Sequence, residues 1–175
     1  MPAISWHEAL SNTESKDLAE HKKKEQGENV VATNRKARHN FEILETWEAG
    51  LVLVGSEVKS LRAGTITIGD GYVVDQGDEL WLVNVHIHEY PQANRQNHEP
   101  MRRRKLLLHQ HEVTDILREL REKGRTIVPL RFYFKGGRCK VEIGSAVGKK
   151  LHDKRADLKE RDAKRELARA RDQDE

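Results

Sequence analysis

The sequence has only one cysteine, Cys139, so a disulfide within the chain is excluded. A lone thiol is typical of proteins from a reducing compartment. No apolar run approaches the ~20 residues that a membrane-spanning helix needs. The first residues also lack the basic and apolar stretches of a secretory signal. We therefore expect a cytoplasmic protein with no membrane partner.

Signatures of catalysis are also missing. The sequence has no nucleotide-binding loop, no nucleophile elbow and no carboxylate pair with catalytic spacing. Nine histidines are present, but none belongs to an HExxH motif or accompanies a cysteine pair. His86 and His88 would share a strand face, whereas His109 and His111 are two residues apart on a predicted helix and cannot share one. We expect no enzyme activity, no metal and no cofactor.

Aromatic residues make up only 5% of the chain, and 36% of residues are hydrophobic. Because apolar residues are so few, they can form a core only where they are concentrated. That region lies between residues 30 and 148. Residues 1–29 carry 4 Lys and Arg against 6 Asp and Glu, and we interpret them as a disordered acidic extension. Residues 149–175 carry 10 against 8, with three of the acids at the last four positions, and form a basic tail.

Patterns within residues 30–148 predict short strands separated by turns. Polar and apolar residues alternate over 41–54, with a bend at Gly50. Apolar residues at i, i+3, i+4 and i+7 predict one amphipathic helix over 109–123. The other expected elements are a short helix capped by Ser56 and ending at Gly64, strands at 65–74, 79–88, 126–135 and 138–144, and a loop at 91–104. The predicted fold is mainly β with helices, a small closed OB-fold-like β-barrel with one major packed helix and a basic C-terminal tail.

The tail has strong helix formers from residue 149 to 171, but its apolar residues are few and mostly alanine. Asp157 with Arg161, and Glu160 with Lys164, have the i, i+4 spacing of helix-stabilising ion pairs. A helix that is polar all round has no face to pack on its own barrel. We expect this segment to be frayed in solution and helical only on a partner.

Three basic segments lie next to element ends, where a rigid fold can hold a cation in place. They are residues 34–39, 102–105 and 148–155. Lys and Arg in such clusters neutralise RNA phosphates. The alternative is a solubilising rim, and the repeated placement beside element ends favours RNA binding.

Several of these segments resemble, in order, the motifs of the SmpB family, the SsrA-binding proteins that partner tmRNA in bacterial trans-translation. The matching blocks are NRKARH at 34–39, EAG at 48–50, GSEVKSLRAG at 55–64, RKLLL at 104–108, CKVEIG at 139–144 and GKKLHDKR at 148–155. The resemblance covers residues 30–161. Two of its blocks, GSEVKSLRAG and GKKLHDKR, are long and specific.

The resemblance implies an RNA-binding adaptor and not an enzyme. Its OB-fold barrel would grip the tRNA-like domain of tmRNA and deliver it to stalled ribosomes, so that incomplete proteins are tagged for degradation. The family's RNA-contacting positions correspond to Asn34, Arg35, Lys36, Phe41, Glu48, Lys59 and Arg62. Alanyl-tRNA synthetase and elongation factor Tu would be indirect partners that act on tmRNA, and we expect a monomer.

Each of these residue types has a chemistry that suits RNA. Lys and Arg neutralise phosphates, Asn34 can bond a base or ribose, and Phe41 offers a stacking face. Glu48 is an acceptor among basic residues, suited to a base amino group or to holding a neighbouring arginine. On chemistry alone, Glu48 can equally be a solubilising residue at a strand edge.

The family's tail is thought to fold into a helix inside the empty messenger channel of a stalled ribosome. The residues that match its motif near the decoding centre are Gly148, Lys149, Lys150, His152, Lys154 and Arg155. The resemblance implies that His152 stacks on a ribosomal RNA base while the lysines neutralise phosphates. The tail would thus report that the channel is vacant.

The chain departs from the family pattern in two places. Its N-terminal extension is longer than usual and acidic, and Phe41 stands where tyrosine is common, which removes a hydrogen bond worth about 1 kcal/mol. The alternative function is a general OB-fold protein that binds single-stranded RNA or acts as a translation factor, which calls for an aromatic stacking platform. A nuclease, the third class, would need clustered carboxylates at metal spacing.

Overall fold

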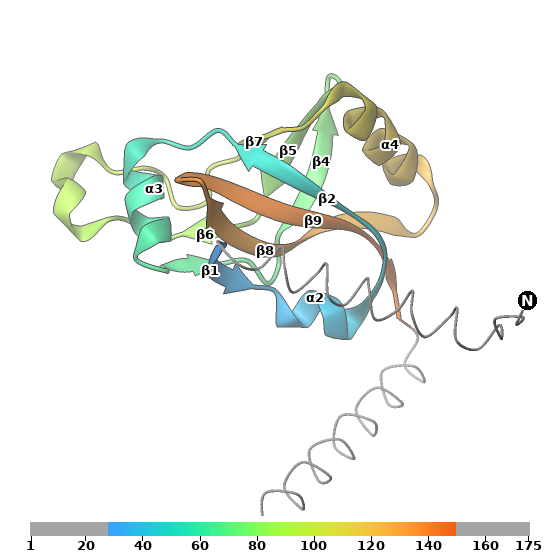
Figure 1. Ribbon diagram of the computed structural model, residues 1–175, viewed down its shortest axis with the longest axis horizontal. Coiled ribbons are helices and arrows are strands. Elements are labelled where there is room, and N and C mark those ends of the chain that lie inside the picture. Colours follow the sequence, from blue (N-terminus) through green and yellow to red (C-terminus); the bar gives the residue numbers. More distant parts are fainter. Residues whose placement is uncertain (1–27, 150–175) are drawn as a thin grey trace, which may run out of the picture.

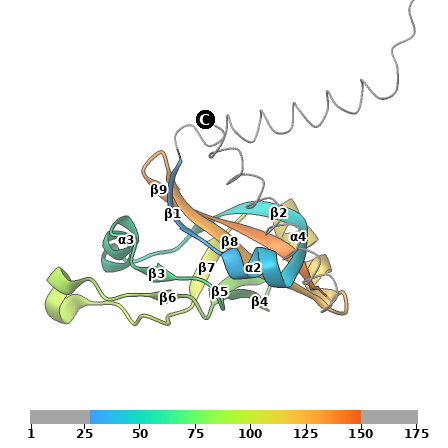
Figure 2. The same cartoon turned by 90° about the horizontal axis from the view of Figure 1, so that it is seen from below.

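The computed structural model describes residues 28–149, which are drawn in colour in Figures 1 and 2. Strands and short helices follow one another along this part of the chain. In order they are β1 (Asn29–Thr33), α2 (Arg35–Asn40), β2 (Phe41–Leu51), α3 (Gly55–Arg62), β3 (Ile66–Thr67), β4 (Tyr72–Gln76), β5 (Glu79–Val83), β6 (His86–Ile87), the 3-10 helix η1 (Pro91–Gln96), β7 (Arg104–Leu107), α4 (Gln110–Arg121), β8 (Arg125–Lys135) and β9 (Arg138–Gly148). None of the helices within 28–149 is long and apolar enough to span a bilayer.

Seven strands form one antiparallel sheet in the order β1-β8-β9-β2-β7-β5-β4, while β3 pairs with β6. The long strands β2, β8 and β9 cross the middle of the molecule (Figure 1). The sheet curls until β4 contacts β8, but both edges of β8 are already paired, with β1 and with β9. The mainly β fold with helices is therefore present. The expected closure of the barrel is not confirmed, because no ladder within residues 28–149 joins the two end strands, β1 and β4.

The core lies inside the curled sheet and follows from strand alternation. Trp47 and Ala49 face inward from β2, and Ile127 and Phe132 face inward from β8, and all four are buried. The inward positions of β8 change phase between Ile127 and Phe132 because the strand has a bulge after Pro129. A bulge is also where a central strand tolerates a proline.

The amphipathic helix predicted at 109–123 is confirmed as α4. Ile116 is completely buried against the core, and Val113, Leu117 and Leu120 pack beside it. The Glu119 carboxylate accepts a hydrogen bond from the Ser145 hydroxyl and pairs with Arg125, so that α4 is also tied to β9 and β8 by polar contacts.

Two of the strand pairs are joined by tight turns whose residues have positive φ. Gly77 and Asp78, between β4 and β5, each have a φ of 61°. Gly136 and Gly137, between β8 and β9, have φ of 56° and 76°. Two consecutive residues in the left-handed region match the right-handed twist of the strands that they join.

Other local expectations need correction. Helix α2 was not expected, and the loop expected at 91–104 contains η1 and ends at the start of β7. The strand expected at 65–74 is divided into β3 and β4 by a turn. Helix α3 is present, but Ser56 does not cap it: the Glu57 carboxylate accepts the Val54 N–H at 2.8 Å, while Ser56 Oγ lies 3.0 Å from His98 Nδ1.

Candidate nucleic-acid interface

Helix α2 is held in place by Asn34, which is only 3% exposed. Its Oδ1 accepts the Ala37 N–H at 2.9 Å and so caps the helix. Its Nδ2 donates to the carbonyls of Ile68, at 3.2 Å, and Pro129, at 2.9 Å. Both amide hydrogens are therefore used within the protein. Asn34 was expected to contact RNA directly, but this arrangement makes it the residue that positions α2.

The residues we call the α2 patch are Arg35, Lys36, Arg38 and Lys149. The three helix residues are exposed, and Lys149 lies beside them because its N–H donates to the Asn40 carbonyl at 2.9 Å. Lys36 has a loose, exposed ion pair with Asp70 at 3.5 Å, which is worth little in water. The patch therefore presents several cations to solvent on one short element.

Phe41 begins β2 directly after α2. It is half-buried against a small cluster that includes Ala37 and Val128, and it lines a groove together with Lys36 and Tyr72. Part of its ring is therefore anchored, while part lies in a groove beside a cation. This placement suits the stacking role suggested by the sequence.

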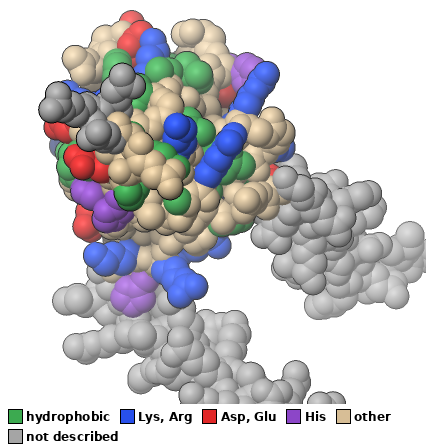
Figure 3. All heavy atoms as spheres, turned by 90° about the vertical axis from the view of Figure 1, so that its left-hand side faces the viewer, with side chains coloured by type: hydrophobic (Ala, Val, Ile, Leu, Met, Phe, Trp, Pro, Cys, Tyr) green, Lys and Arg blue, Asp and Glu red, His purple; other side chains and the backbone are tan. Residues whose placement is uncertain are grey.

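A second group of cations, which we call the α3 patch, consists of Lys59, Arg62 and Arg138. Lys59 Nζ lies 5.4 Å from the centre of the Tyr90 ring, and Arg62 Cζ lies 5.7 Å from the centre of the Phe134 ring. All three cations are exposed, and none pairs with an acidic residue of the described chain. Figure 3 shows the face that carries α3, from which Lys and Arg side chains project at several places.

Helix α3 is fixed by a buried ion network around Glu57, which is completely buried. Its carboxylate binds the guanidinium of Arg104 at 2.9 Å and that of Arg102 at 2.6 Å. Burial by itself raises the pKa of Glu57, but the hydrogen bonds and charges of the two arginines outweigh it and hold that pKa below its usual value. The carboxylate therefore stays ionised and ties α3 to β7.

The same network changes the interpretation of the basic segment at 102–105. Arg104 is fully buried and also donates to the carbonyls of Val85 and Pro100. Lys105 pairs with Glu79. Most of this segment, considered from sequence as an RNA-binding cluster, is therefore used to hold the protein together.

Glu48 lies on the outer face of the sheet, among basic residues as expected. It accepts hydrogen bonds from the Tyr133 hydroxyl and from Lys135 at 3.1 Å, and Lys140 lies 3.4 Å away. Partial burial raises the pKa of Glu48, but these donors outweigh it and lower that pKa overall. Glu48 on β2 thus orients one lysine on β8 and one on β9. The sequence suggested that Glu48 holds a neighbouring arginine, and in the structure it holds these two lysines instead.

The sequence analysis did not predict that charged residues and a tyrosine would line one face of the β8–β9 hairpin. Arg131, Tyr133 and Lys135 occupy alternate positions of β8, as Lys140 and Glu142 do on β9. The Arg131 guanidinium lies over the Tyr133 ring at 4.8 Å and pairs with Glu142 at 2.5 Å. A period of two in charged residues on a hairpin was the available signal.

The structure distributes the expected RNA residues instead of gathering them in one cluster. Arg35, Lys36 and Phe41 are on or next to α2, Lys59 and Arg62 are on α3, and Glu48 is on β2. Helices α2 and α3 lie on either side of β1 (Figure 2). Gly148 ends β9 opposite Phe41, and Lys149 joins the α2 patch. The other expected ribosome-contacting residues, Lys150, His152, Lys154 and Arg155, lie outside the described residues.

The described residues bring no set of metal ligands together. Within 28–149, no three residues of the His, Cys, Asp and Glu types come together as metal ligands. Burial raises the pKa of the Cys139 thiol to about 12, so the thiol is protonated and unreactive at neutral pH.

Comparisons with known proteins agree on one family. The family model described as SmpB protein matches residues 31–173. A protein named SsrA-binding protein from Desulforudis audaxviator (strain MP104C) is 57% identical over 143 residues, which are 82% of this chain and 94% of that protein. Its namesake from Agrobacterium fabrum is 56% identical over 141 residues, 80% of this chain and 88% of that one.

A solved structure is also similar. It is a chain from work described as "tmRNA-SmpB: a journey to the center of the bacterial ribosome", with a TM-score of 0.61 and 47% sequence identity. The likeness covers 70% of this chain and 85% of the other.

Proposed function

Because this chain belongs to the SmpB family, a family of RNA-binding proteins and not of enzymes, we propose that it binds the tRNA-like domain of tmRNA and delivers it to stalled ribosomes. Delivery would lead to tagging of the incomplete protein for degradation. The protein supplies no catalytic group in this scheme. Its contribution is to hold one RNA and bring it to another.

The observation that carries the proposal is a pair of exposed cationic helices, each fixed by a buried polar side chain. Asn34 holds the α2 patch, and Glu57 holds the α3 patch. Cations on rigid elements match the fixed phosphate positions of a folded RNA better than cations on a flexible segment, because less conformational entropy is lost on binding. We assign contacts with tmRNA to Arg35, Lys36 and the α3 patch, with Phe41 as a stacking residue.

The basic tail is proposed to act on the ribosome. Gly148 ends β9, and Lys149 is the last described residue, so the tail leaves the folded part beside the α2 patch. From there Lys150, His152, Lys154 and Arg155 would contact ribosomal RNA near the decoding centre. A tail with helix formers but no apolar face suits a partner made of RNA. The tail would thereby sense an empty messenger channel.

The alternative, a general OB-fold protein for single-stranded RNA, is less well supported by the surface. Such proteins stack successive bases on exposed aromatic rings. On the long strand β8 of the described chain, Phe132 and Tyr133 are buried and Phe134 is half-buried. Cations spread over two helices suit a structured RNA that is recognised by its shape.

The remaining expectations follow from this role. Alanyl-tRNA synthetase and elongation factor Tu would act on the same tmRNA as indirect partners, and the protein would work in the cytoplasm, where ribosomes are, as a monomer. The monomeric state is open to a direct check by light scattering of the purified chain.

Purification of the full-length chain from bacterial cells, followed by sequencing of the bound RNA, tests the proposed function. We expect strong enrichment of tmRNA over other small RNAs. The R35A/R62A double variant should lose this enrichment, while R121A, which removes an exposed cation from α4 at the other end of the molecule, should keep it (Figure 1). Enrichment of many unstructured RNAs in place of tmRNA would favour the alternative.

A further inference from the structure

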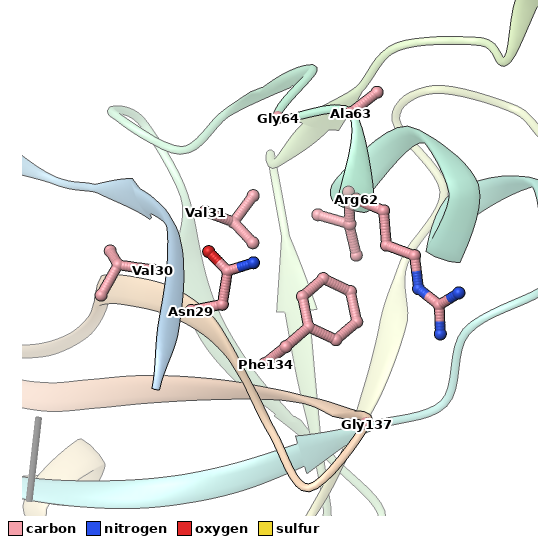
Figure 4. A pocket seen from close by; sticks show the side chains of 9 residues that line it. Asn29, Val30, Val31, Arg62, Ala63, Gly64, Phe134 and Gly137 are labelled. Carbon is pink, nitrogen blue, oxygen red and sulfur yellow. The ribbon is translucent and has the colours of Figure 1, made fainter. Parts of the chain in front are cut away.

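A groove opens between β1, the end of α3 and the β8–β9 hairpin (Figure 4). Its volume is about 490 Å³, within the range of sites that hold small organic ligands. The described residues that line it are Asn29, Val30, Val31, Leu61, Arg62, Ala63, Gly64, Phe134 and Gly137. No carboxylate is among them, so an electronegative ligand meets no repulsion from this lining.

An aromatic ring and a cation line this groove together, with Arg62 Cζ 5.7 Å from the centre of the Phe134 ring. The Phe134 ring lies between Asn29 and Arg62 (Figure 4). The ring is half-buried and packs against the main core, so its orientation is fixed before any ligand arrives. Arg62, in contrast, is exposed and has no acidic partner among residues 28–149. A planar group can therefore stack on the fixed ring once the guanidinium, which lies over that ring, moves outward to cover the bound group.

The polar groups around the groove suit a base with its attached phosphates. The Asn29 amide is exposed and forms no hydrogen bond with another described residue, so its donor and acceptor are free to bind a base edge. Lys59, which is exposed, lies one turn before Arg62 on α3 and outside the groove itself. RNA that continues from the groove along α3 therefore meets a second cation.

We propose that this groove holds one unpaired nucleobase of the bound RNA, stacked on Phe134 and covered by Arg62. The inference rests on the proposed function and specifies how the α3 patch recognises its RNA. A phosphate alone would lose hydration over an apolar ring and gain no stacking, whereas a base uses the ring, the amide and the guanidinium together. Phe134 therefore contributes to binding as well as to the core.

Two substitutions at the ring separate stacking from packing. Phe134→Leu keeps an apolar side chain against the core but removes the stacking face, and Phe134→Trp keeps it. We expect F134L to weaken binding of the transcribed tRNA-like half of tmRNA about ten-fold or more. F134W should bind within about two-fold of wild type. Thermal unfolding of both variants checks that the fold is retained.

The base itself is located with 2-aminopurine, a fluorescent base analogue whose emission falls when it stacks. The probe is placed at each unpaired position of the tRNA-like half in turn. One position should show quenching with wild-type protein that is lost with F134L. Asn29→Ala, on an exposed edge strand, should weaken binding a few-fold and change the quenching at the same position. If F134L fails to fold, this variant tests the base site in its place.

The results distinguish this inference from the proposed function. Wild-type affinity in F134L and N29A, with no position whose quenching depends on either residue, would overturn the base site while leaving tmRNA binding intact. Absence of binding by the wild-type chain would overturn both. R121A serves as the matched control and should bind like wild type.

Discussion

Buried polar residues, more than the exposed cations themselves, determine where this surface can bind. Asn34 and Glu57 have no solvent-facing role in the described structure, yet each fixes a helix that carries cations. A buried polar group destabilises the folded state when it has no hydrogen-bond partner. Removing Asn34 or Glu57 would leave its partners in that condition. Such residues affect RNA binding indirectly, through the helix that they position.

The substitution Asn34→Ala should destabilise the protein by about 2–4 kcal/mol. It removes a helix cap, worth about 1 kcal/mol, and leaves the buried carbonyls of Ile68 and Pro129 without their donor. Urea unfolding measures the change. Asn34→Asp is the matched variant, because it keeps the oxygen that caps the helix but loses the amide donor. Its loss of stability should therefore differ from that of N34A. If N34A unfolds like wild type, the hydrogen bonds to Asn34 do not hold α2.

Glu57 gives the stability a defined dependence on pH. Its pKa in the folded protein is below the ordinary value of 4.5, so its contribution is complete above pH 4.5 and is lost as the pH falls through the lower folded pKa. Glu57→Gln leaves Arg104 buried without a counter-charge and should cost roughly 3 kcal/mol at pH 7. The difference from wild type, measured by urea unfolding, should shrink below about pH 4.5. A constant difference down to pH 2.5 would contradict an ionised Glu57.

At the scale of elements, the sequence predicted those whose side chains repeat over several turns or pairs. Helix α4 and strands β2, β8 and β9 have clear periods of 3.6 or 2, so they were found with errors only at their ends. Helix α2 is too short to show a period, and its cap, Asn34, was interpreted as an RNA ligand. Strand β7 was hidden because Arg104, a residue that normally stays exposed, is buried beside Glu57.

The candidate site was predictable to a similar extent. The motif resemblance indicated Lys59 and Arg62 on α3, which are exposed as an RNA contact requires. The sequence alone could not show that Arg104 is buried or that Glu48 contacts Lys140, because both facts depend on how distant strands pair.

The β8–β9 hairpin depends on its two glycines. Gly136 has a φ of 56°, a conformation that side chains with a Cβ rarely adopt. Gly136→Ala should destabilise the protein by about 1 kcal/mol, as measured by thermal or urea unfolding. Gly55→Ala is the control, because Gly55 opens α3 with open space around it and no positive φ, and alanine there should be neutral or slightly stabilising. Equal effects of the two would argue against a strained turn.

At the scale of the whole molecule, the proposal divides two RNA contacts between two kinds of structure. The α2 and α3 patches lie on a rigid sheet, and the tail beyond Lys149 carries most of the residues assigned to the ribosome. Two sites in one chain raise the effective concentration of the second partner once the first is bound, so each can be individually weak. Rigid and tail contacts should therefore be separable by mutation.

Salt dependence tests the contribution of the exposed cations. Each lysine or arginine that neutralises a phosphate adds close to one to the slope of log K against log salt. Arg35→Ala, which removes an exposed cation from α2, should lower that slope by about one for the tRNA-like half, measured by titration at several salt concentrations. Arg121→Ala should leave the slope unchanged. An unchanged slope in R35A would mean that Arg35 does not contact a phosphate or displace its counterions.

The most direct measurement compares two variants against two ligands. The affinities of R62A, and of a chain lacking residues 150–175, are measured for the tRNA-like half of tmRNA and for ribosomes stalled with an empty messenger channel. We predict that R62A weakens binding of the tRNA-like half much more than binding of the ribosome, and that the truncation does the opposite. Equal losses of both variants for the tRNA-like half would contradict the division between rigid patches and tail.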